Sequence, residues 1–88
     1  MLDDRRDRID HHGPRLVWEQ VAEDLANEIT SGRLAPGAKL PTEVEISEQY
    51  GVSRVTVRRA VGELAERGLL ARVHGRGTYV STSGGEAQ

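Results

Sequence analysis

The segment from Leu40 to Val80 contains three short units separated by glycines, and this order constrains the fold more than any other feature of the chain. The first unit opens at Thr42, closes at Gly51 and has the residue types of a short helix. The second is rich in arginine, shows helical periodicity and closes at Gly68. The third consists of two short β-prone runs around a pair of glycines, as in a hairpin. The segment therefore predicts two helices joined by a tight turn and followed by a β-hairpin.

The turn between the two predicted helices is defined by residues that favour helix ends. Thr42 and Glu45 form a T-x-x-E capping box, in which each side chain satisfies a free backbone N–H of the other residue. Gly51 can take a positive φ angle, and Ser53 can cap the second helix. Gly62 lies in the middle of that helix, where glycine costs about 1 kcal/mol relative to alanine; close helix packing and a tolerated surface position both explain it. The predicted inward face consists of Val57, Ala60, Val61 and Leu64.

An earlier helix and two flexible ends complete the expected organisation. Apolar residues recur at every fourth position from Val17 to Ile29, which predicts a helix over residues 16–31, followed by a loop that reverses the chain. Residues 1–14 are polar, of mixed charge and without periodicity, so we expect them to be disordered. The expected boundaries are a disordered N-terminal arm over 1–14, a domain over 15–81 with a helix-turn-helix at about 42–67 and a wing at 69–81, and a flexible tail or linker over 82–88.

Composition narrows the class of protein. The 88 residues suit one small domain, and the absence of cysteine excludes disulfides and thiolate metal sites. No apolar run approaches the roughly 20 residues that cross a bilayer, so we expect a cytoplasmic protein without a membrane partner. The pair His11–His12 lacks further ligands at useful spacing and is interpreted as part of a solvated tail. Because no nucleophile–base set or paired carboxylates stand out, we expect no enzyme, no catalytic residues, no cofactor and no metal.

The charge distribution favours nucleic acid although the net charge of −2 does not. Residues 1–38 carry a balance of −3, whereas residues 39–80 carry +2 and the part from 54 to 80 carries +4. A local basic face matters more for phosphate contact than the total charge. Eleven of the twelve basic residues are arginine, which is suited to bidentate contact with phosphates and guanine edges.

The predicted helix–turn–helix would let the second helix protrude and bring its first residues to base edges in a major groove. The hairpin tip would present an arginine between two glycines, a side chain favoured in narrow minor grooves. Two plainer interpretations stay open: an amphipathic helix with a solvated arginine face, and a solvent-exposed hairpin. The candidate DNA-binding residues are Thr42, Ser53, Arg54, Val55, Thr56, Arg58, Arg59, His74, Gly75, Arg76 and Gly77.

The motifs in this segment carry a resemblance to a known family. The run LPTEVEISEQYGVSRVTVRRAV, preceded by I-x-x-G-x-L-x-P-G and followed by L-x-x-x-G-x-L-x-x-x-x-G-x-G-T-Y-V, resembles the DNA-binding domain of GntR-type bacterial transcription regulators. Its GRGTYV ending is most similar to the HutC-like branch. The resemblance implies an α+β, mainly α, winged helix-turn-helix of three helices and a small antiparallel hairpin. It also implies that Ser53, Arg54, Thr56 and Arg58 contact the major groove, and that His74, Gly75 and Arg76 form the wing in the minor groove.

Two residues depart from the pattern of the family. Val44 stands where the second helix usually carries an arginine that reaches a base or a phosphate, and Val55 stands where threonine is common. Val44 cannot make that polar contact, so one base preference of the typical operator is in doubt. Members also usually continue into an effector-binding domain that makes the dimer. The chain is therefore either an excised domain or a natural single-domain regulator, and it has a small-molecule effector only if a C-terminal domain lies beyond it.

The function expected from the sequence is that of a sequence-specific transcription regulator, a repressor, which binds a palindromic double-stranded DNA operator as a homodimer. The alternative from another class is a winged-helix module for protein–protein contact, with its acidic first helix as the docking face. A protein-docking module would not require Arg54, Arg58 and Arg76 together, which favours the DNA-binding hypothesis.

Overall fold

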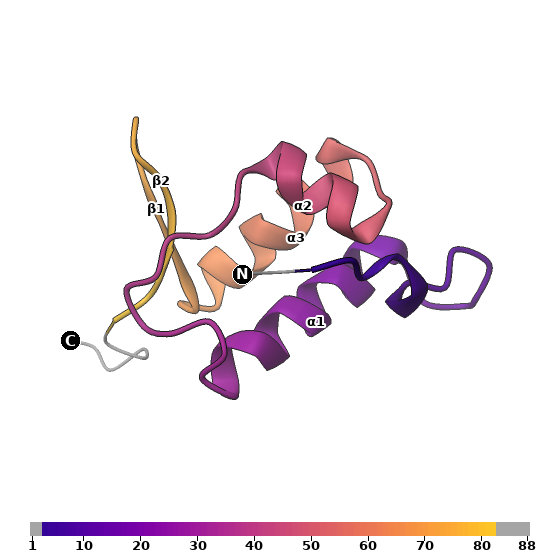
Figure 1. The fold of residues 1–88 in the computed structure, drawn as a ribbon, viewed down its shortest axis with the longest axis horizontal. Coiled ribbons are helices and arrows are strands. Elements are labelled where there is room, and N and C mark those ends of the chain that lie inside the picture. Colours follow the sequence, from indigo (N-terminus) through magenta and orange to yellow (C-terminus); the bar gives the residue numbers. More distant parts are fainter. Residues whose placement is uncertain (1–2, 83–88) are drawn as a thin grey trace.

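Three helices and a β-hairpin make up the fold in the computed structural model, which describes residues 3–82 (Figure 1). Helix α1 packs against α3, α2 also packs on α3, and the hairpin extends to one side of the helices (Figure 1). No helix among residues 3–82 combines the length and apolarity that crossing a membrane requires. The elements are the 3₁₀ turn η1 (Arg6–Arg8), α1 (Val17–Thr30), α2 (Glu43–Tyr50), α3 (Arg54–Glu66), β1 (Leu70–Val73) and β2 (Gly77–Val80).

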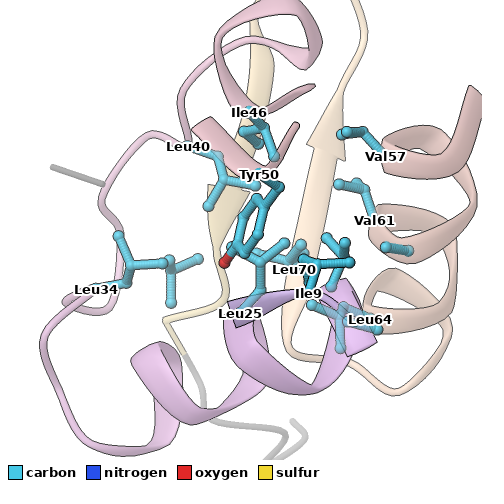
Figure 2. Packing of buried hydrophobic residues seen from close by; sticks show 14 residues of the cluster. Ile9, Leu25, Leu34, Leu40, Ile46, Tyr50, Val57, Val61, Leu64 and Leu70 are labelled. Atoms are coloured by element: carbon cyan, nitrogen blue, oxygen red, sulfur yellow. The ribbon is translucent and has the colours of Figure 1, made fainter. Parts of the chain in front are cut away.

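The core is aliphatic and is built around one buried tyrosine. Tyr50, at the end of α2, is fully buried, and its hydroxyl group points toward α1 (Figure 2). There it donates a hydrogen bond to Asp24, so the one polar atom of the ring has a partner. The inward face predicted for α3 is confirmed, because its four residues are all buried: Val57, Ala60, Val61 and Leu64.

The helix–turn–helix forms as the capping residues predict. Thr42 accepts a hydrogen bond from the backbone N–H of Glu45, and the Glu45 side chain accepts one from the backbone N–H of Thr42, which completes the capping box. Gly51 has φ 68° and ψ 40°, a left-handed conformation that stops α2 at that residue. Ser53 then caps α3 by accepting from the backbone N–H of Thr56 at 3.1 Å. These local bonds fix the angle at which α3 leaves the turn.

The hairpin pairs with a third segment that the sequence did not predict. Strands β1 and β2 are antiparallel, with Leu70 opposite Val80 and Val73 opposite Gly77. Residues 37–40 run along the outer edge of β2, held by three backbone hydrogen bonds of 2.8–2.9 Å and a bridge between Lys39 and Tyr79. This segment directly follows Pro36 and is too short to show strand periodicity, so the sequence predicts no strand there. With this addition, the expected fold class, a winged helix-turn-helix, is confirmed.

The N-terminal arm differs from the disordered segment that the sequence predicts. Arg5 and Ile9 are only 6% and 7% exposed, and η1 lies between them against α2. The backbone N–H of Arg5 donates to the carbonyl of Gln49 at 2.7 Å, and its guanidinium donates to Asp24 at 2.7 Å. Arg8 also donates to Asp24, and Gln20 on α1 binds the backbone of Asp10. These anchors are spread along the arm without helical or strand periodicity, so no pattern in the sequence predicts them. Apart from Thr82, the flexible tail or linker expected over residues 82–88 lies outside the described residues.

Candidate nucleic-acid interface

The first turn of α3 projects its predicted contact residues from the body of the domain. Ser53 and Thr56 are joined through their hydroxyl groups at 3.0 Å, in addition to the capping bond, so both side chains are held at the helix start. Arg54 is exposed, and Val55 is the most exposed large apolar side chain of the described residues, at 68%. The helix therefore offers hydroxyl, guanidinium and methyl groups together, which are the groups that read base edges.

Arg58 lies one turn further along α3 and is held by α2. Its Nε donates to Glu43 Oε2 at 3.1 Å and its Nη2 donates to Oε1 at 3.0 Å, a bidentate pair on the surface. The hydrogen bond from Arg58 is the main cause that holds the pKa of Glu43 below its ordinary value, and the positive charges of Arg54 and Arg72 lower it further. The pair fixes the plane of the guanidinium and leaves Nη1 outside this bidentate contact.

The tip of the hairpin has a conformation that requires its two glycines. Gly75 and Gly77 have φ angles of +76° and +119°, which side chains with a Cβ atom rarely adopt. The backbone N–H of Arg76 donates to the carbonyl of Val73 at 2.9 Å and closes the turn. His74 and Arg76 are exposed on either side of Gly75. The tip therefore presents two polar side chains on a narrow backbone that can approach a partner closely.

A groove of about 530 Å³ separates the hairpin from the start of α2 and the middle of α3. Five of the predicted contact residues line it: Thr42, Arg58, Gly75, Arg76 and Gly77. Four more lie at the start of α3, outside the groove, and His74 lies at the hairpin tip. The structure thus divides the predicted residues between a protruding helix end and a groove that faces the wing.

Arg59 is the predicted residue that turns away from this groove. Its guanidinium carbon lies 4.5 Å from the centre of the Trp18 ring on α1, a cation–π contact. The side chain therefore ties α3 to α1 in this structure. The helical pattern places Arg58 and Arg59 about 100° apart around the helix axis, but it does not say which of the two directions faces the groove. That depends on how α3 packs against its neighbours.

Two basic residues that the sequence did not single out also line the groove. Lys39 comes from the segment that pairs with β2, and Arg72 comes from β1. Lys39 stands outside the helix–turn–helix signature, and Arg72 stands among strand residues. Neither has a local motif of its own, and only the packing of the hairpin brings them together.

The charge pairing within the domain separates these cations from the others. Among residues 3–82, seven of the twelve basic side chains have a carboxylate partner within 4.0 Å. The five basic residues without one in the described part of the chain are Lys39, Arg54, Arg59, Arg72 and Arg76. All of them belong to α3, the hairpin or the segment beside it, so the uncompensated positive charge gathers on these elements.

Val44 lies on the exposed side of α2, at 43% exposure. Its neighbour Glu43 engages Arg58, but Val44 itself offers only methyl groups to a partner. At the position where members of the family usually have an arginine, the side chain in this protein therefore offers no hydrogen-bond donor.

The chain matches known regulators over nearly all of its described length. The profile "Bacterial regulatory proteins, gntR family" matches residues 18–80. The HTH-type transcriptional repressor NagR of Bacillus subtilis (strain 168) is 45% identical over 73 residues, which cover 83% of this chain and 30% of NagR. The histidine utilization repressor of Klebsiella aerogenes is 38% identical over 74 residues, which cover 84% of this chain and 31% of that protein.

Solved structures agree with these sequence matches. The structure of AraR(DBD) in complex with operator ORX1 is similar at a TM-score of 0.73 and 40% identity, covering 83% of this chain and 94% of that one. YtrA from Sulfolobus acidocaldarius, a GntR-family transcription factor, is similar at a TM-score of 0.76 and 32% identity, covering 83% and 77%. The chain spans about 30% of the length of the curated relatives described above. The chain belongs to the gntR family of bacterial regulatory proteins.

Proposed function

We propose that the chain is the DNA-reading unit of a transcriptional repressor of the HutC-like branch. It binds a palindromic operator as two copies, because a two-fold arrangement of the protein matches paired half-sites on the duplex. The first turn of α3 enters the major groove and the wing enters the adjacent minor groove. A small-molecule effector acts on it only through a further domain. We assign it no enzymatic activity and place it in the cytoplasm.

The observation that carries this proposal is the set of cations on α3, the hairpin and the segment beside it that have no carboxylate partner among residues 3–82. Phosphate binding requires positive charge that the protein has not already neutralised. Here five of the seven arginines with a carboxylate partner lie before α1 or in the loop after it, while the cations without one among residues 3–82 lie on α3, the hairpin and the segment beside it. The named relatives are repressors, and the similar AraR domain is bound to an operator, which supports the same role for this chain.

Some of the predicted contact residues suit base recognition, and others suit phosphate binding. Arg54 and Arg58 supply guanidinium donors for base edges, and Val55 supplies methyl groups that suit a thymine methyl. Ser53 and Thr42 lie at helix starts, where backbone N–H groups and the helix dipole favour phosphate. Arg76 suits the narrow, electronegative minor groove beside the site that α3 reads.

A protein-docking role for the acidic α1 is disfavoured by the contacts of its carboxylates. Glu23 is paired with Arg15, Asp24 with Arg5, and Glu28 with Arg33. Three acids of this helix are therefore neutralised within the domain, by one arginine of the N-terminal arm, one that directly precedes α1 and one in the loop after it. The surface left for a basic partner is smaller than the sequence suggests.

Selection of DNA from a random library tests the proposal. The chain is immobilised, mixed with duplexes that carry a randomised centre, and the bound fraction is amplified over several rounds. We expect enrichment of one half-site that recurs as an inverted repeat, and tighter binding to it than to a scrambled duplex in fluorescence anisotropy. A bound pool that stays random in sequence after repeated rounds would contradict sequence-specific recognition.

A further inference from the structure

The groove between the helices and the wing contains more positive charge than the predicted contact residues explain. Four basic side chains line it, namely Lys39, Arg58, Arg72 and Arg76, and Glu43 is the one carboxylate among its lining residues. Glu43 is already bound to Arg58 in the bidentate pair. The remaining three cations line the groove, and none of them has a carboxylate within 4.0 Å in the part of the chain that the structure describes.

Lys39 reaches the groove by crossing the wing at Gly77. A Cβ atom built on Gly77 would lie 2.9 Å from Cε and 3.7 Å from Nζ of Lys39. The lysine stem therefore occupies the space that any larger residue at position 77 would need. Backbone pairing of residues 37–40 with β2 fixes the start of this side chain, and its ammonium group lies near Gly77, close to the tip of the wing.

Arg72 reaches the groove from β1, and its guanidinium lies over α3 at Gly62. A Cβ atom on Gly62 would lie 3.0 Å from Nη2 of Arg72, and this same nitrogen lies 3.5 Å from the carbonyl oxygen of Arg58. That contact is long and weak, so most donors of the guanidinium are left for a ligand. The mid-helix glycine, for which close helix packing and a surface position were both open, instead lies under a strand arginine.

We infer that Lys39 and Arg72 form a clamp for the sugar–phosphate backbone that passes between the major groove read by α3 and the minor groove read by the wing. This inference rests on the proposed function. The two side chains enter the groove from β1 and from the segment paired with β2, each lies across a glycine, and neither has a carboxylate partner within 4.0 Å among residues 3–82. The DNA strand that separates these two grooves must cross the space between α3 and the wing. There the clamp supplies affinity that does not depend on base sequence.

The test compares Lys39→Gln and Arg72→Gln in the full chain with Arg67→Gln as a matched control. Arg67→Gln removes the same charge, but Arg67 lies at the far end of α3 and is paired with Glu63. Fluorescence anisotropy measures binding to the selected duplex and to a scrambled duplex at roughly 50 to 200 mM salt. We expect each clamp variant to bind both duplexes about three- to tenfold more weakly, with the ratio between duplexes unchanged. Each should also lower the slope of log K against log salt by about 0.9, whereas the control should not.

Three outcomes decide the inference. An unchanged salt slope in both clamp variants, equal to that of the control, would overturn it. A loss confined to the selected duplex would also overturn it, because the residues would then contact bases. If the unaltered chain does not distinguish the two duplexes, the proposed function itself fails, and that result is visible before any variant is measured. Circular dichroism confirms that each variant is folded, since both side chains are exposed.

Discussion

Arg5 offers the sharpest test of how the domain is stabilised, because the sequence places it in a disordered arm and the structure places it in a buried network. Its side chain is 7% exposed and donates to Asp24 Oδ2 at 2.7 Å and to Glu28 Oε2 at 3.2 Å. Tyr50 donates to the same oxygen of Asp24. Burial alone would lower the pKa of Arg5, but the hydrogen bonds to the two carboxylates outweigh it, so the pKa is raised and the charge is retained. We predict that Arg5→Ala destabilises the domain.

The magnitude follows from the partners that remain in the variant. Removing one partner of a buried ion pair costs about 3–5 kcal/mol when the other charge is left without compensation. Here Arg8 still donates to Asp24 Oδ1 at 2.9 Å, and Arg33 still donates to Glu28 at 3.1 Å. We therefore expect a smaller loss, about 2 kcal/mol in the free energy of unfolding, or about 10 °C in Tm for a domain of this size.

Urea and thermal unfolding at neutral pH, followed by circular dichroism, measure this loss. Arg15→Ala is the matched control, because Arg15 pairs with Glu23 on the same helix but both side chains are more than half exposed. Surface pairs of this kind contribute little, so the control should unfold as the unaltered chain does. Midpoints for Arg5→Ala that equal those of the control would refute the reasoning and restore a disordered arm.

The remaining predictions concern pH and the DNA-binding surface. Asp24 and Glu28 have pKa values lowered in the folded state, the first by hydrogen bonds from Tyr50 and Arg5 that outweigh burial and the second chiefly by Arg33. The two carboxylates therefore stabilise the folded state above about pH 4, and this stabilisation is lost as the pH falls through their lowered pKa values. Because Arg5→Ala removes part of it, the free energy of unfolding of this variant should decline less than that of the unaltered chain between neutral and acidic pH, as measured by urea titration. Arg76→Ala should weaken binding to the selected duplex while Tm stays unchanged; equal affinity in anisotropy would exclude the wing from the interface. Arg58→Ala should weaken that binding roughly ten- to a hundredfold, and an equal loss on scrambled DNA would assign Arg58 to a phosphate.

Features encoded by neighbouring residues were predictable from the sequence, whereas features made by distant residues were not. The capping box at Thr42, the turn at Gly51 and the inward face of α3 depend on residues within one or two helical turns, and all three were confirmed. The Arg5 network joins the arm to residues of α1 and α2 that lie far along the chain. Nothing in the composition of residues 1–14 distinguishes the one arginine that is buried from its exposed neighbours.

The same distinction between local and long-range contacts applies to the residues of the candidate site. Residues at the start of α3 could be assigned from the helix–turn–helix pattern, because their position relative to the cap sets their direction. Lys39 could not, because it reaches the groove only through backbone pairing between residues 37–40 and β2. The sequence predicts Arg59 as a DNA contact, but the position of its guanidinium over the Trp18 ring depends on the packing of α3 against α1. The sequence therefore predicts which segments are rich in cations, and tertiary packing determines which of these side chains are left to contact a partner.

The pair of Arg58 and Glu43 explains why the basic groove should discriminate between sequences as well as bind. Glu43 binds Nε and Nη2 of Arg58 in a bidentate contact, so the pair as a whole carries no net charge, and we expect a random duplex to gain little attraction from it. We expect a duplex with a guanine at the right position to gain from a guanidinium that is already held in one plane, because less conformational freedom is then lost on binding. On this reasoning the pair adds less affinity for wrong sequences than for the right one, and specificity is such a difference between two affinities.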